Sequence, residues 1–178
     1  MNNMLNLYPP ILGFAAWSGT GKTTLLKKLI PALKSAGLRP AVIKHAHHTF
    51  DIDTPGKDSF ELRKAGADTM LIGSSSRWAL MVERDSGTEP RLAELLGHLP
   101  AQRHDLILVE GFKHESFAKI EVHRPAREKP LMFPDDDSII AIATDASLGI
   151  TAEIPVLDLN DLRSITDFVI SYSRRQQS

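Results

Sequence analysis

A glycine-rich run at residues 16–23, Ala-Trp-Ser-Gly-Thr-Gly-Lys-Thr, lies between an apolar stretch and a segment with leucines at helical spacing. It follows the pattern G-x-x-x-x-G-K-[ST], with alanine in place of the first glycine. Gly19 and Gly21 allow backbone N–H groups to converge on phosphate oxygens, and a helix that begins near Lys22 points its positive dipole end at the same anion. The run therefore predicts a phosphate-binding loop (P-loop) that joins a strand to a helix. The alternative is a glycine-rich turn that only caps a helix.

The pattern also assigns roles to individual side chains. Lys22 is expected to act catalytically on the β- and γ-phosphates of a nucleoside triphosphate, and the Thr23 hydroxyl to bind Mg²⁺. Glu110 ends an apolar strand and supplies the second acid that the metal needs, so we predict a catalytic and metal-binding role for it; the alternative is an acid that only ends a strand. Asp105 begins the same strand and is expected to be structural. The nucleotide-binding residues of the loop are predicted to be Ser18, Gly19, Thr20, Gly21, Lys22, Thr23 and Thr24.

Apolar runs and helical periodicity alternate along the chain. Strands are expected at residues 11–17, 41–45, 69–73, 78–82, 105–110, 119–122, 139–143 and 156–157, and helices from near residue 22 to 37, at 58–64, at 90–99 and up to about 172. Asp58 with Glu61 predicts a capping box, and Asn160 is expected to cap the last helix. Several strands are apolar on both faces, which is typical of a parallel sheet. The predicted fold class is α/β, a P-loop NTPase with a mostly parallel layered sheet, helices on both faces and an antiparallel addition at one edge.

The bulk composition narrows the functional classes. A length of 178 residues predicts one nucleotide-binding domain over residues 1–178. The net charge of -1 gives no basic excess for nucleic acid or a membrane surface, and the absence of cysteine excludes disulfides and thiolate metal sites. No signal peptide or apolar membrane span is evident, so the expectation is a cytoplasmic protein without nucleic-acid or membrane partners.

Several longer blocks resemble the MobB family. The similar blocks are residues 15–25, 43–48, 56–59, 62–67 and 106–114, and the resemblance extends from about Ile11 to Asp145. The resemblance implies a dimeric GTP-binding protein with weak intrinsic GTPase activity. Such a protein would assist the attachment of GMP to molybdopterin in molybdenum cofactor (molybdopterin guanine dinucleotide) biosynthesis, together with the guanylyltransferase MobA and neighbouring pathway proteins.

Asp145 is the candidate for reading the guanine base. It follows the apolar run 139–143 and Thr144, a layout that many GTPases use, although the usual Asn-Lys-x-Asp pattern is missing. The alternative is an aspartate that caps the next turn. The roles of other polar residues stay open. His45, His47 and His48 are candidates for metal binding, for polar contacts at the rim of the site, or for plain surface residues. Asp58 is a cap or a site residue, and Arg63 a solvated or paired surface residue or a catalytic one. Lys113 and His114 are candidates for contacts near the γ-phosphate, and Arg124 and Arg127 lie in a solvated loop or contact a partner or phosphate.

Three other functions share these features. A metallochaperone GTPase would use histidine-rich segments, but this chain has no cysteine and no long histidine tract. A small-molecule kinase would need an arginine-bearing lid, for which only residues 124–127 qualify. A non-catalytic adaptor that keeps GTP as a structural ligand differs from the leading hypothesis only in its kinetics.

Overall fold

The computed structural model describes residues 8–46, 50–84 and 87–177 of the chain. The chain divides into two compact units, unit 1 with residues 1–45 and 91–178, and unit 2 with residues 46–90. The P-loop lies in unit 1. The prediction of one nucleotide-binding domain over residues 1–178 is not tested by this division and stays a prediction.

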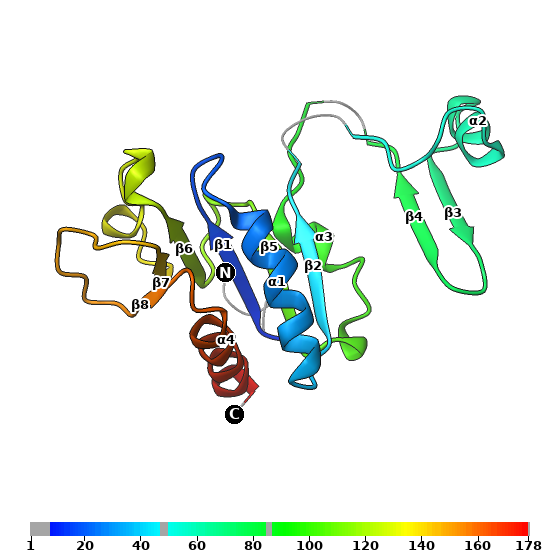
Figure 1. The fold of residues 1–178 in the computed structure, drawn as a ribbon. Helices are drawn as coiled ribbons and strands as arrows, with labels where there is room; N and C mark the ends of the chain where they lie inside the picture. Colours follow the sequence, from blue (N-terminus) through cyan, green and yellow to red (C-terminus); the bar gives the residue numbers. More distant parts are fainter. Residues whose placement is uncertain (1–7, 47–49, 85–86, 178) are drawn as a thin grey trace. The chain divides into compact units, whose positions relative to one another are not determined.

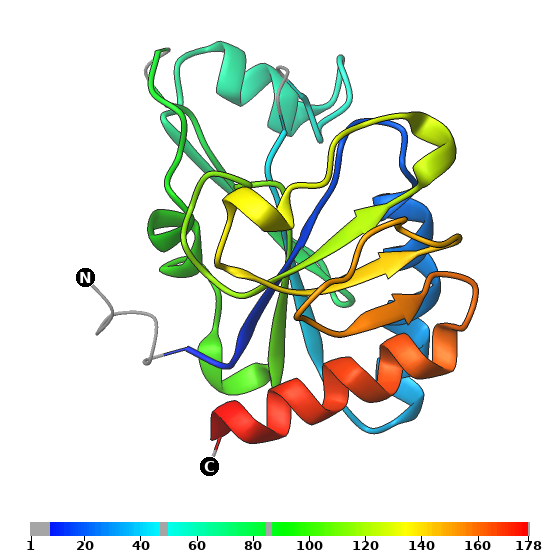
Figure 2. The same ribbon diagram turned by 90° about the vertical axis from the view of Figure 1, so that its left-hand side faces the viewer.

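Unit 1 is built on a six-stranded sheet in the order β2-β5-β1-β6-β7-β8, in which every neighbouring pair is parallel (Figures 1 and 2). The strands are β1 (Ile11–Ala15), β2 (Pro40–Lys44), β5 (Leu106–Glu110), β6 (Lys119–His123), β7 (Ile139–Thr144) and β8 (Val156–Asp158). The central strands β1 and β6 are buried along their whole length, whereas the edge strand β2 alternates between buried and exposed residues. The apolar runs of the sequence therefore correspond to strands covered on both faces.

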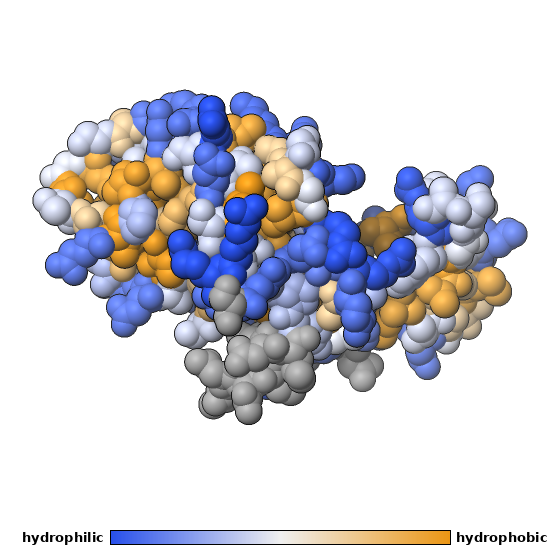
Figure 3. Space-filling view, turned by 90° about the horizontal axis from the view of Figure 1, so that it is seen from below, coloured by the Kyte–Doolittle hydropathy of each residue, from blue (hydrophilic) through white to orange (hydrophobic). Residues whose placement is uncertain are grey.

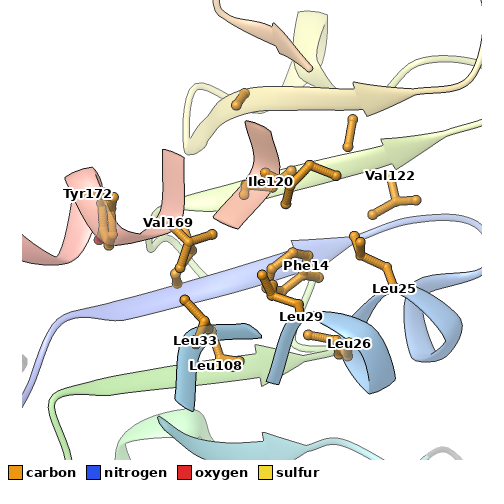
Figure 4. Packing of buried hydrophobic residues seen from close by; sticks show 14 of the residues in the cluster. Phe14, Leu25, Leu26, Leu29, Leu33, Leu108, Ile120, Val122, Val169 and Tyr172 are labelled. Atoms are coloured by element: carbon orange, nitrogen blue, oxygen red, sulfur yellow. The ribbon is translucent and has the colours of Figure 1, made fainter. Parts of the chain in front are cut away.

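Two helices, α1 (Lys22–Ser35) and α4 (Leu162–Gln177), pack against one face of this sheet. Helix α1 buries Leu25, Leu26, Leu29 and Leu33, whose spacing places them on one side of the helix. Figure 4 shows these leucines against Phe14, Leu108, Ile120 and Val122 of the sheet and Val169 and Tyr172 of α4. This packing anchors the helix that begins at the P-loop.

The other face of the sheet is covered by the short helix α3 (Leu92–Leu96) and by Phe112 and Phe117, which follow β5. Among its described residues, unit 1 also contains three short 3₁₀ helices, Ala101–Arg103, Pro125–Arg127 and Phe133–Asp135. The predicted α/β fold with helices on both faces is thus confirmed. No helix in the described ranges combines the length and apolar character needed to cross a bilayer.

Unit 2 contains helix α2 (Asp58–Lys64) and the antiparallel pair β3 (Thr69–Gly73) and β4 (Trp78–Val82), all with the predicted bounds. The two strands pair with each other in a separate sheet, so the antiparallel addition is not a strand at the edge of the parallel sheet. Edge placement depends on pairing between distant residues, which a local pattern does not encode.

Two predicted helix caps are wrong. Asn160 does not cap α4; the Asp161 carboxylate does, because its Oδ1 accepts hydrogen bonds from the backbone N–H groups of Arg163 (3.0 Å) and Ser164 (3.1 Å). Asp58 is the first residue inside α2, after Lys57 at the cap position, and no side chain makes a capping hydrogen bond there. Its charge in the first turn still complements the helix dipole.

Asp105 has the structural role expected of it. Its carboxylate accepts hydrogen bonds from the backbone N–H (2.8 Å), Nε (2.9 Å) and Nη2 (2.7 Å) of Arg39. The bonded Arg39 guanidinium lowers the pKa of Asp105 to about 2. This pair ties the start of β5 to the residue that precedes β2, and so aligns two neighbouring strands whose other ends reach the site.

Candidate functional site

The P-loop connects the end of β1 to the start of α1, as predicted. Gly19 and Gly21 have φ values of 77° and 98°, in the left-handed region that favours glycine. Gly21 immediately precedes α1, and its carbonyl accepts the N–H of Leu25 at 2.9 Å. The N–H groups of the first helical turn, from Lys22 onward, have no acceptor within the helix and are available to an anion.

The other predicted loop residues differ in exposure. Ser18, Gly19 and Thr24 are exposed, whereas Thr20 is 2% exposed and its hydroxyl donates to the Trp17 carbonyl at 2.8 Å. The Thr20 side chain therefore closes the loop on itself, and only its backbone is left to face a ligand.

Lys22 lies across the loop, with its Nζ donating to the Ala16 carbonyl at 3.0 Å. Partial burial lowers the pKa of Lys22, and the positive charges of Lys113 and Lys44 act in the same direction, while Glu110 opposes them. An ammonium group that is partly buried and has two other cations nearby would be stabilised by an incoming anion. The position thus favours a polyphosphate ligand.

Thr23 at the start of α1 and Glu110 at the end of β5 meet at the carboxyl edge of the sheet. The Thr23 hydroxyl donates to Glu110 Oε1 at 2.9 Å, and Lys44 Nζ lies 3.6 Å from Oε2 of the same carboxylate. Phe14 of β1 is in register with Glu110 of β5, which brings the carboxyl ends of both strands to the same edge. A hydroxyl and a carboxylate are oxygen ligands of the type that Mg²⁺ prefers, so this pair fits the ion expected in a P-loop site.

Gly111 allows the close approach of β2 to the end of β5. It has a φ of 101°, and a Cβ placed on it would lie 2.6 Å from the Cβ of His45. The backbone N–H of His45 donates to the Glu110 carbonyl at 2.8 Å. Glycine at this position therefore keeps the Glu110 backbone next to β2.

Of the three candidate histidines, His45 lies in the described structure, while His47 and His48 fall outside the described residues. The His45 ring lies 4.8 Å from the Phe112 ring, centroid to centroid. Within residues 8–46, 50–84 and 87–177, no three histidine or acidic side chains form a group that could hold a metal ion.

Arg124 connects Asp145 to the P-loop. Its Nε donates to the Thr20 carbonyl at 2.9 Å, and its Nη1 forms an ion pair with Asp145 Oδ2. The sequence left Arg124 open between a solvated loop and a contact with a partner or phosphate; its side chain is only 33% exposed. Its contact with the P-loop could not be identified from the sequence, because it joins residues 104 positions apart.

A buried carboxylate positions the segment that covers the other side of the loop. Glu121 of β6 is 1% exposed and accepts the backbone N–H groups of Met132 (2.9 and 3.0 Å) and Phe133 (2.9 Å). Burial raises the pKa of Glu121, and these hydrogen bonds oppose that effect. The same segment reaches the P-loop, since Trp17 Nε1 donates to the Pro130 carbonyl at 2.8 Å.

Two further candidates are placed by their contacts. Lys113 Nζ lies 5.3 Å from the centroid of the Trp17 ring, so it borders the P-loop; His114 is exposed beside it. In unit 2, Arg63 is ion-paired with Asp51 (2.7 Å) and Glu83 (2.6 Å). These contacts agree with its interpretation as a paired residue, but the side chain is only 10% exposed, so it does not lie open on the surface.

The family model and the curated relatives agree on one family. The family model for molybdopterin guanine dinucleotide synthesis protein B matches residues 11–145. The chain is 51% identical over 168 residues to a molybdopterin-guanine dinucleotide biosynthesis adapter protein of Escherichia coli strain K12, covering 94% of this chain and 95% of that one. It is 41% identical over 170 residues to the protein of the same name from Haemophilus influenzae, covering 95% and 90%. A crystal structure of molybdopterin-guanine biosynthesis protein B superposes with a TM-score of 0.72 at 25% identity, covering 92% of this chain and 99% of that one.

The glycine at position 111 gives a first test of the site. Gly111→Ala should lower the free energy of unfolding by roughly 2–5 kcal/mol, because a positive φ costs about 1–2 kcal/mol and overpacking adds about 1–3. Gly37→Ala is the matched control: Gly37 has a φ of 87° but no atom within 4 Å of an added Cβ, so only the first cost applies. Chemical denaturation measures both, and equal losses would show that the approach of His45 to Gly111 does not constrain the site.

Proposed function

The chain belongs to the molybdopterin guanine dinucleotide synthesis protein B (MobB) family, and we propose that it acts in molybdopterin-guanine dinucleotide biosynthesis as an adapter that binds GTP with Mg²⁺. The observation that carries the nucleotide part is the meeting of Lys22, Thr23 and Glu110 at the P-loop. Lys22 and Thr23 occupy the positions that the motif assigns to them, and Thr23 at the start of α1 shares a hydrogen bond with Glu110 at the end of β5.

The sheet order supports one direction for the proposed nucleotide. Strands β5 and β6 flank β1 on opposite sides, so Glu110 lies on one side of the P-loop and Arg124 with Asp145 on the other. In our proposal the γ-phosphate lies toward Glu110 and the base toward Asp145. A ligand bound this way spans the crevice at the carboxyl ends of the strands. At this crevice, β1 lies between β5 on one side and β6 on the other.

Thr23 and Glu110 would hold Mg²⁺, directly or through water, and the ion would neutralise negative charge on the β- and γ-phosphates. Lys22 supplies a second positive charge on the same phosphates, and the first N–H groups of α1 donate to their oxygens. Asp145 accepts the N1–H and N2–H groups of guanine, which adenine does not present in that arrangement.

We extend the proposal to a homodimer, for which unit 2 provides a surface. Leu71 and Leu80 are paired across β3 and β4, as are Gly73 with Trp78 and Thr69 with Val82, so these residues share one face of the two-stranded sheet. The exposed fractions of Leu71, Trp78, Leu80 and Val82 range from 39% to 65%. Figure 3 shows hydrophobic side chains at the surface of this unit. A two-stranded sheet is marginally stable alone, and a second copy would cover its apolar face.

Slow hydrolysis is part of the proposal. Residues 16–23 contain no arginine, and no glutamine follows Gly111 closely enough to orient an attacking water. A missing arginine finger alone can reduce the rate by about 10³ to 10⁵. An adapter with these residues would hold GTP until a partner, proposed to be the guanylyltransferase MobA, docks.

Lys22→Ala should weaken GTP binding by about 100-fold or more while leaving the fold intact, because it removes a charged donor to the phosphates. Lys28→Ala is the matched control, since Lys28 is an exposed lysine of the same helix. Calorimetric titration with Mg²⁺ and GTP measures the affinity, and circular dichroism checks the fold. A folded Lys22→Ala variant that binds like wild type would contradict the P-loop assignment.

The wild type should prefer GTP to ATP, and Asp145→Ala should reduce that preference. Asp145→Asn should instead favour xanthosine triphosphate, because an amide offers one acceptor and one donor to the N1–H and O2 groups of xanthine. Competition titrations with the three nucleotides test each part. If ATP displaces GTP from wild type at equal concentration, the base specificity is wrong; if only the variants behave like wild type, another residue reads the base.

Single-turnover hydrolysis by the isolated protein should be slow. The rate should rise when the guanylyltransferase is added, or when the protein concentration is raised so that the dimer forms. The rate is measured across a dilution series alongside the molecular mass in solution. Many turnovers per second from dilute protein alone would identify a self-sufficient enzyme instead.

A further inference from the structure

The planar guanidinium group of Arg124 contacts two different residues. Its Nε donates to the Thr20 carbonyl at 2.9 Å, inside the P-loop, and its Nη1 pairs with Asp145 Oδ2, after β7. The same guanidinium lies close to Gly21, since its Nη2 is 3.7 Å from the position of an added Cβ there. No other described hydrogen bond or ion pair joins Asp145 to the P-loop.

The placement of this pair separates it from the phosphate-binding side chains. Arg124 follows β6, on the far side of β1 from Glu110, and the Asp145 and Arg124 side chains are 25% and 33% exposed. The contact is therefore partly shielded from water. A charge-assisted pair in such a place is stronger than one on an open surface. It can fix the direction of a carboxylate that would otherwise rotate freely at the end of its strand.

We propose that Arg124 is a positioning residue for base specificity: it holds the Asp145 carboxylate in the orientation that accepts guanine and ties that orientation to the P-loop. This inference rests on the proposed function, in which Asp145 reads the base. The carboxylate keeps Oδ1 and one lone pair of Oδ2 for guanine while Arg124 occupies the other side. Preorganising the acceptor reduces the ordering that binding would otherwise require.

The geometry requires an arginine. A guanidinium holds its Nε and Nη1 donors in one rigid plane but points them in different directions, so a single group can bond the Thr20 carbonyl through Nε and Asp145 through Nη1. A lysine ammonium at the same place is a single point charge on a flexible stem and does not reproduce that paired geometry. Arg124→Lys therefore tests positioning separately from charge.

The experiment compares Arg124→Gln, Arg124→Lys and the control Arg127→Gln, whose side chain is exposed in the same segment. Dissociation constants for GTP and ATP are measured with Mg²⁺, and thermal unfolding checks that each variant is folded. We expect Arg124→Gln and Arg124→Lys to weaken GTP binding by about tenfold, with ATP affinity changed by less than about twofold. Arg127→Gln should match wild type.

A double-mutant cycle adds a second readout. In an Asp145→Ala background, Arg124→Gln should cause no further loss of GTP affinity, because the two residues act as one unit. Equal loss of GTP and ATP affinity, an unchanged GTP-to-ATP ratio, or additive effects in the cycle would each overturn the inference and leave Arg124 as a support of the loop alone. A wild type that does not prefer GTP would overturn the proposed base specificity itself, and the wild-type measurement alone shows this.

Discussion

The parallel pairing of β1 with β5 is the constraint on which the site depends. Because Phe14 and Glu110 are in register, the residue after β1 and the residue that ends β5 emerge at the same edge of the sheet. The Thr23 hydroxyl then lies 2.9 Å from Glu110 Oε1, so the end of β5 itself places the carboxylate beside the P-loop. The pairing is stabilised by burial of both strands, and the Arg39–Asp105 contact fixes the start of β5 to the residue before β2, its other neighbour.

The charges around the loop separate it into two functional sides. On the Glu110 side, Lys22, Lys44 and Lys113 concentrate positive charge, and the lowered pKa of Lys22 reflects burial together with the repulsion of its neighbours. On the other side, the Arg124–Asp145 pair presents a carboxylate that is directed by a cation. A triphosphate and a base would thus meet different chemistry at the two ends of one crevice.

The segment after β6 is shaped by buried polar residues. Glu121 accepts backbone N–H groups of residues 132 and 133, and Lys119, which is 1% exposed, donates to Asp136 (2.9 Å) and Ser138 (2.6 Å). Buried polar groups are stable only when they are hydrogen-bonded, so these contacts specify the path of a segment that has little regular structure. That path brings Pro130 to Trp17 and Arg124 to Thr20, both in the P-loop.

Features that depend on neighbouring residues followed from the amino-acid sequence alone. The apolar runs predicted the strands, the leucine spacing predicted the buried face of α1, and the glycine pattern predicted the loop that leads into Lys22, because these signals are local backbone and burial preferences. The contacts between distant groups became known only from the folded structure. It put β3 and β4 in a sheet of their own, chose Asp161 over Asn160 as the helix cap, and turned Arg124 from a loop residue into the link between Thr20 and Asp145. The physical reason is that strand pairing and side-chain contacts across the sheet depend on register and packing between segments far apart in the chain, and local patterns do not record them.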